Sequence, residues 1–119
     1  MPTVLVAIAG GLGAVLRYRI GLAVGVRSFP WATLGVNISG SFVLALVLAG
    51  PAVRWSTSTT AALAVGFIGA YTTFSTFGYE TITLMREDRA VEAASYVAMS
   101  LVGGLAASAL GYLAGRGLA

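Results

Sequence analysis

The sequence contains no cysteine, no histidine and no lysine, and charged residues of any kind are few. Without cysteine, disulfides and thiolate metal sites are excluded. Without histidine, the commonest proton shuttle and metal ligand is missing. The four acidic residues are Glu80 and three close to one loop. No metal triad or nucleophile–base pair can be built from them, so we do not expect an enzyme.

Apolar residues dominate the chain. Of its 119 residues, 58% are hydrophobic and 9% are charged, and the mean hydropathy is +0.92. A soluble domain is usually about a quarter charged. The net charge of +3 is carried entirely by arginine, and in a membrane protein such charge concerns topology and lipid head groups rather than nucleic acid. We therefore expect an all-α integral membrane protein that crosses a cell membrane several times.

Four segments have the roughly 20 apolar residues that a membrane-spanning helix needs. The expected spans cover about residues 4–25, 32–49, 59–85 and 90–114, and together they make a single transmembrane domain over residues 1–119. Pro30 is suited to the start of the second span, and Gly50 and Pro51 to its end. An even number of spans places both termini on the same face of the membrane.

The arginines do not choose an orientation clearly. Arg54 and Arg116 lie on the face of the termini, and Arg27, Arg86 and Arg89 lie on the other face. A bias this weak barely selects one orientation under the positive-inside rule. Two interpretations remain open. The chain inserts in one orientation with its first and third loops in the cytoplasm, or it inserts both ways and forms an antiparallel homodimer.

Small residues recur at four-residue spacing in two of the spans. The first span has Gly13, Gly21 and Gly25 in register with Arg17. The fourth span has the row Gly103, Ala107, Gly111 and Gly115. Rows of this kind let helix backbones approach closely in a membrane. The pattern predicts close packing, either within a subunit or between subunits.

Polar residues form a row on the second span. Thr33, Asn37 and Ser41 are four apart and share one helical face. The amide of Asn37 offers two donors and one acceptor, so it is suited to a helix–helix hydrogen bond or to a polar pathway. Tyr96 and Ser100 have the same spacing on the fourth span, where a packing stripe and a pore-lining stripe look alike.

The third span carries the most unusual stretch, residues 66–80. This stretch contains several Thr and Ser hydroxyls and ends in the carboxylate of Glu80. The hydrocarbon core of a membrane tolerates polar groups only where they face protein or a water-filled path. Gly66 and Gly69 favour a helix break, which would free backbone carbonyls for a cation. The ring edges of Phe74 and Phe77 carry positive potential and could contact an anion. Nearby hydroxyls could donate to an anion or bond back to their own helix; they belong to Thr72, Thr73, Ser75 and Thr76.

Arg17 and Glu80 fall near the same membrane face, one in the first span and one in the third. They could form an ion pair, or they could line a vestibule in which the arginine attracts an anion. Charges at this depth are expensive unless they are well partnered or hydrated.

Three motifs occur in a fixed order. Residues 10–18 read GGLGAVLRY, residues 33–42 read TLGVNISGSF, and residues 69–77 read GAYTTFSTF. Together they resemble the first-, second- and third-helix motifs of the Fluc family of fluoride channels, also called CrcB. Ala70 and Tyr71 replace a Gly-Phe pair that is frequent in the family, and Gly104 stands where a third fourth-helix hydroxyl is often found.

The resemblance implies an antiparallel, dual-topology homodimer in the bacterial inner membrane, which exports fluoride passively through two pores at the subunit interface. It also implies a third helix broken in mid-membrane, with the backbone carbonyls of Gly69 and Thr72 from both subunits holding a structural sodium ion. Arg17 and Glu80 match vestibule positions. With the polar row and the hydroxyl run, the resemblance gives these pore residues: Phe74, Phe77, Asn37, Thr33, Ser41, Thr76, Tyr96 and Ser100.

Two other classes fit the length and the number of spans. A small multidrug-resistance-type exporter of cationic compounds needs a carboxylate deep in its first span to exchange protons, and this span has only Arg17 and Arg19 as charged residues. A non-transporting assembly subunit would explain the glycine rows, but it would not explain the row at Asn37 or the hydroxyl run.

Overall fold

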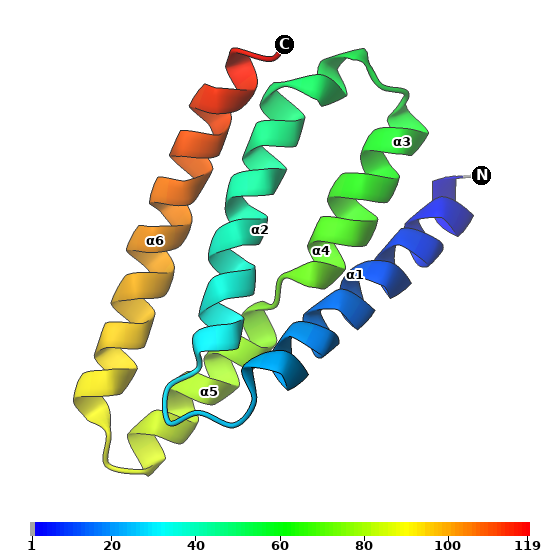
Figure 1. Ribbon diagram of the computed structural model, residues 1–119. Coiled ribbons are helices and arrows are strands. Elements are labelled where there is room, and N and C mark those ends of the chain that lie inside the picture. The colour runs from blue at the N-terminus through cyan, green and yellow to red at the C-terminus, as the bar shows by residue number, and fades with distance from the viewer. Residues whose placement is uncertain (1) are drawn as a thin grey trace.

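The computed structural model describes residues 2–119, and within that range every regular element is helical (Figure 1). Four segments are long and apolar enough to cross a membrane, which confirms the expected all-helical, four-span chain; the protein is a multi-pass membrane protein. The elements in chain order are α1 (Pro2–Val24), α2 (Trp31–Ala49), η1 (Pro51–Arg54), α3 (Thr57–Ala61), η2 (Ala62–Ile68), α4 (Gly69–Tyr71), α5 (Phe74–Arg86) and α6 (Ala90–Arg116).

The elements from α3 to α5 follow one another as the third segment, Thr57–Arg86. The hydroxyl of Ser56 starts this segment by accepting the N–H of Thr59 at 3.1 Å, which satisfies a donor that the helix would otherwise leave unpaired. The seven residues that follow α3 form η2, a wider π-helix. Such π-helical turns occur often at functional sites.

The four spanning segments form two parallel pairs (Figure 1). α1 and the third segment run side by side in one direction. α2 and α6 also run side by side in a shared direction, which is opposite to that of the first pair, and both termini lie at the same end. Glycine makes each pair close: a Cβ on Gly13 would collide with the carbonyl of Phe67, and one on Gly111 with the carbonyl of Phe42. At these positions the small-residue rows therefore pack within the subunit, whereas a Cβ on Gly21 would meet open space.

The third segment changes direction at Thr72 and Thr73, which we call the interruption. Thr72 has φ −91° and ψ 160°, and Thr73 has φ −152° and ψ 119°, so both are extended between α4 and α5. Gly66 and Gly69, which favoured a break, are both helical. Thr72, which the resemblance placed at the break together with Gly69, lies in the interruption. Gly66 is needed for packing instead: a Cβ there would lie 2.7 Å from the carbonyl oxygen of Val6 on α1.

The interior of the subunit is small. A buried cluster of Leu34, Leu84, Ala93 and Tyr96 joins α2, α5 and α6, and Phe77 packs against it. Most large apolar side chains on α1 and α6 are exposed instead. This is the expected distribution for helices whose outer faces meet lipid rather than water.

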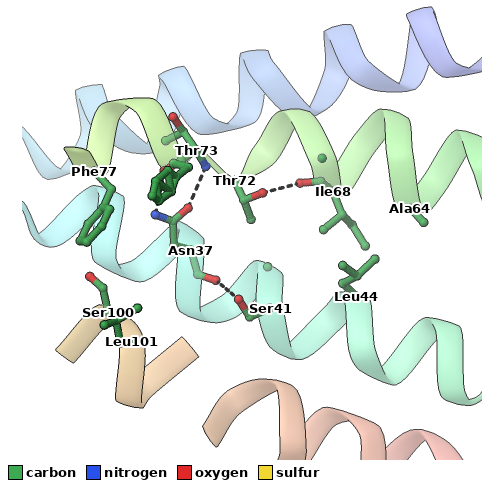
Figure 2. A pocket seen from close by; sticks show the side chains of 13 residues that line it. Asn37, Ser41, Leu44, Ala64, Ile68, Thr72, Thr73, Phe77, Ser100 and Leu101 are labelled. Carbon is green, nitrogen blue, oxygen red and sulfur yellow. Dashed lines mark hydrogen bonds between the residues drawn. The ribbon is translucent and has the colours of Figure 1, made fainter. Parts of the chain in front are cut away.

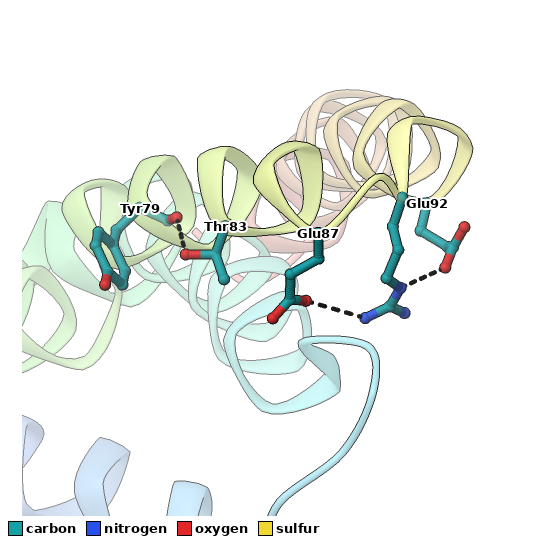
Figure 3. A network of polar contacts seen from close by, with 5 residues as sticks. Tyr79, Thr83, Glu87 and Glu92 are labelled. Carbon is teal, nitrogen blue, oxygen red and sulfur yellow. Dashed lines mark hydrogen bonds and ion pairs between the residues drawn. The ribbon is translucent and has the colours of Figure 1, made fainter.

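Charges concentrate at the turn between α5 and α6. Arg89 forms ion pairs with Glu87 at 3.7 Å and with Glu92, as Figure 3 shows. In the same view, the Thr83 hydroxyl bonds back to the carbonyl of Tyr79 on α5 at 2.9 Å. These contacts lie at the surface, where single ion pairs contribute little to stability.

Candidate functional site

A cavity of about 300 Å³ lies between α2, the third segment and α6 (Figure 2). We call it the Asn37 cavity. It brings five of the predicted pore residues together with both predicted sodium ligands, and its lining is mainly apolar. Those seven residues are Asn37, Ser41, Phe74, Phe77, Ser100, Gly69 and Thr72.

The side chain of Asn37 is bonded to the interruption at two points. Its Oδ1 accepts the N–H of Thr73 at 2.8 Å, and its Nδ2 donates to the carbonyl of Thr73 at 3.0 Å. Figure 2 shows the amide of Asn37 turned toward Thr73. The amide thus gives an extended residue the two backbone partners that a helix would have supplied. A second Nδ2 proton is left over, since the amide carries two.

Several hydroxyls around the cavity are already committed to protein partners. Ser41 donates to the carbonyl of Asn37 at 2.7 Å and Thr72 to that of Ile68 at 3.1 Å, so both bond back to their own helix. Thr73 is the N-cap of α5: its hydroxyl accepts the N–H of Thr76 at 3.2 Å.

Ser100 is the exception. Its Oγ is a buried side-chain oxygen with no hydrogen-bond partner among residues 2–119. A buried hydroxyl without a partner is uncommon and carries a desolvation penalty. It is therefore available to a small ion or a water that enters the cavity.

Three aromatic rings form a row that leads away from the cavity. The centroids of Phe74 and Phe77 are 5.7 Å apart, and those of Phe77 and Tyr96 are 5.1 Å apart, with tilted planes in both pairs. Tilted rings of this kind present edges as well as faces. Tyr96 is fully buried, whereas Phe74 is 77% exposed in the single chain.

Glu80 lies at the far end of this row and accepts two hydroxyls. Tyr96 donates to its Oε1 at 2.8 Å, and Thr33 donates to its Oε2 at 3.1 Å. Thr33 and Tyr96 therefore do not line the Asn37 cavity; their hydroxyls meet at the carboxylate. Glu80 and Thr33 border a separate cavity of about 250 Å³ near the loop between α1 and α2.

Arg17 and Glu80 do not form an ion pair among residues 2–119. Pairing was one of two expected outcomes, and it is wrong because each group has another partner. The Nε of Arg17 donates to the carbonyl of Ala70 at 3.0 Å. Arg17 instead lines a cavity of about 470 Å³ together with Thr33, Thr73 and Thr76. Since Thr73 also lines the Asn37 cavity, the two spaces adjoin at the interruption.

Comparison with known proteins identifies the family. A family model described as "CrcB-like protein, Camphor Resistance (CrcB)" matches residues 4–112. The chain belongs to the CrcB family. A relative from Moorella thermoacetica, named "Fluoride-specific ion channel FluC 2", is 41% identical over 121 residues, covering 99% of both chains.

Two further CrcB relatives carry similar names. "Fluoride-specific ion channel FluC 1" of Desulfitobacterium hafniense is 46% identical over 103 residues, which cover 84% of this chain and 90% of the relative. "Fluoride-specific ion channel FluC 2" of Rhodococcus jostii is 45% identical over 113 residues, which cover 94% of this chain and 96% of the relative.

In this CrcB chain, two carbonyls beside the interruption lose the donors that a continuous helix would give them. The N–H of Thr73, which would reach Gly69, goes to Asn37, and the N–H of Thr76, which would reach Thr72, goes to the Thr73 hydroxyl. No hydrogen bond outside the helices reaches either carbonyl among residues 2–119. Unpaired carbonyl oxygens are hard ligands of the kind that alkali and alkaline-earth cations accept.

Sequence reasoning treated Thr73 only as one hydroxyl among four. In this CrcB structure it has three further roles: it is held by Asn37, it caps α5 and it lines both adjoining cavities. A threonine three residues before Thr76, at the start of a helical stretch, is an N-cap signal, and it would have placed the helix start at Phe74.

Proposed function

We propose that the protein is a fluoride-selective channel that lets fluoride leave the cytoplasm passively and so confers fluoride resistance. The observation that carries this proposal is the match along nearly the whole chain to relatives named as fluoride-specific ion channels. The alternative of a proton-coupled exporter of cationic compounds finds no support, since α1 has no carboxylate and the matched relatives bear a different function in their names.

The Asn37 cavity supplies the chemistry that a small, strongly hydrated anion needs. Conduction requires binding that replaces water yet remains weak enough for release. The partners on offer are the spare N–H of Asn37, the unpaired hydroxyl of Ser100 and the edges of Phe74 and Phe77. None of these carries a full positive charge. A row of such donors lets fluoride pass from one to the next without a deep trap.

In this proposal the path of fluoride continues from the Asn37 cavity past the hydroxyls of Thr33, Tyr96 and Thr76. Its mouth is lined by Glu80 and Arg17. Fluoride that reaches the hydroxyls of Thr33 and Tyr96 competes with the carboxylate of Glu80 for them. Arg17 lines the larger neighbouring cavity, where its positive charge favours anion entry.

We further propose that one four-helix domain, residues 1–119, works as an antiparallel homodimer whose two pores lie at the subunit interface, with the interruption in mid-membrane. The 77% exposure of Phe74 supports this arrangement, because a ring that lines a pore needs a second wall. A second copy laid across Phe74 supplies that wall.

The carbonyls of Gly69 and Thr72 fit a structural sodium ion shared by the two subunits, since both have lost their helical donors. When bound, the ion would offset the partial negative charge of these carbonyls and favour an anion nearby. We expect the purified dimer to melt at a lower temperature when sodium is replaced by N-methylglucamine. Equal melting temperatures in both solutions would argue against the site.

Fluoride efflux from reconstituted liposomes, measured with a fluoride electrode, tests the function. Wild-type protein should release fluoride and retain chloride. Phe74→Ile and Phe77→Ile should lower fluoride release while gel filtration still shows a dimer. Phe67→Ile is the matched control, because its ring stacks on Tyr71 outside the Asn37 cavity. Release from wild-type vesicles no faster than from empty vesicles would refute the proposal.

The absence of cysteine makes dual topology simple to test. A single cysteine is introduced as Ser28→Cys in the loop between α1 and α2, and intact cells are treated with a membrane-impermeant maleimide. Insertion in both orientations predicts labelling of about half the protein, with full labelling after lysis. Complete labelling, or none, in intact cells would show a single orientation.

A further inference from the structure

The side chain of Arg17 reaches across from α1 to the backbone just before the interruption. Its Nε donates to the carbonyl of Ala70 at 3.0 Å, although the two residues are 53 positions apart in the sequence. In an unbroken helix that carbonyl would accept the N–H of Phe74. The extended conformations of Thr72 and Thr73 remove this donor, and the guanidinium takes its place.

The packing of α1 on the third segment brings these groups together. The two run in the same direction and touch backbone to backbone, because Gly66 meets the carbonyl of Val6 and Gly13 meets that of Phe67. One turn further along both helices, Arg17 arrives beside Ala70. The glycine contacts therefore fix the register in which this bond is made.

The charge on Arg17 has no carboxylate partner among residues 2–119, since both ion pairs there belong to Arg89. The side chain is half-buried, and its bond to a neutral carbonyl is of the stronger, charge-assisted kind. Arg19 contrasts with it. It lies two residues on, on another face of α1, is exposed, and makes no side-chain hydrogen bond within the described range.

We propose that Arg17 is a positioning residue: by holding the carbonyl of Ala70, it fixes the backbone of residues 70–73. Asn37 can then bond both backbone groups of Thr73, and the carbonyls of Gly69 and Thr72 keep one orientation. Arg17, from α1, bonds to the backbone just before the interruption, and Asn37, from α2, bonds to the backbone within it. The bond stands on the geometry alone, and its consequence for fluoride passage rests on the proposed function.

Amide hydrogen exchange, followed by mass spectrometry on the full chain in lipid nanodiscs, measures this order directly. Arg17→Ala should raise exchange about tenfold in peptides that cover residues 70–76, as expected for the loss of a charge-assisted bond. Peptides from α6 should not change. Arg17→Lys should lie between, because lysine keeps the charge but lacks the planar guanidinium fork. Arg19→Ala removes the same charge and should match wild type.

Equal exchange in Arg17→Ala and Arg19→Ala over residues 70–76 would overturn the proposal. If Arg17→Ala does not fold, Arg17→Lys decides: faster exchange confined to those residues supports the role, and wild-type exchange overturns it. Fluoride efflux is measured on the same samples, where only the Arg17 variants should lose flux. If wild-type protein passes no fluoride, the proposed function fails while the exchange result still decides the role of Arg17.

Discussion

Replacing Asn37 with alanine removes both side-chain partners of Thr73 at once. The two bonds, 2.8 and 3.0 Å long, join α2 to the interruption. A hydrogen bond contributes about 0.6–1.5 kcal/mol in a membrane protein or a folded interior, so Asn37→Ala should lower the free energy of unfolding by about 1–3 kcal/mol. Fluoride flux should fall as well, since the variant loses both the donor and the fixed backbone.

The assay is unfolding by sodium dodecyl sulfate in mixed micelles, followed by the fluorescence of Trp31 and Trp55. Ser41→Ala is the matched control from the same face of α2. Its hydroxyl bonds only to its own helix, so it should change stability by less than about 0.5 kcal/mol. If Asn37→Ala unfolds at the same concentration as Ser41→Ala, the amide does not hold the interruption and the reasoning is wrong.

Three smaller predictions concern packing, the carboxylate and the surface. Gly13→Ala should destabilise the fold by about 1–3 kcal/mol, because its Cβ meets backbone, whereas Gly11→Ala, in open space, should be nearly neutral in the same unfolding assay. Tyr96→Phe keeps the ring but removes a donor to Glu80, and should cost about 1–2 kcal/mol and slow fluoride efflux. Arg89→Ala should shift stability by less than about 1 kcal/mol in that assay, because its ion pairs are at the surface.

The number of spans could be predicted from the sequence, because membrane spanning depends on local composition. Pro30 and Gly50 bound α2 as expected. The place of the interruption could not be predicted from glycine content, because Gly66 and Gly69 both lie in helical turns and the extended residues are threonines. Its position depends on a contact made from another helix, the bonds of Asn37 to Thr73.

In the candidate site, too, features set within one helix could be predicted from the sequence, whereas contacts between helices could not. Spacing predicted that Asn37 and Ser41 share a face of the second span, and both residues line the Asn37 cavity. Phe74 and Phe77, whose ring edges were expected to contact an anion, line the same cavity. Spacing did not predict that Thr33 and Tyr96 would donate to Glu80. Nor did it predict the partner of Arg17. These pairings join different helices, and one sequence does not reveal the register between helices.

The distribution of hydrogen bonds around the cavity bears on how an anion could pass. Most polar groups there are committed to protein partners: Ser41 and Thr72 to their own helices, and Thr73 to Asn37. A pore in which every hydroxyl was free would bind a dehydrated anion tightly and release it slowly. Commitment of these groups leaves the second N–H of Asn37, the hydroxyl of Ser100 and the ring edges as partners. The bonds that fix the interruption therefore also limit how strongly the cavity can hold the ion.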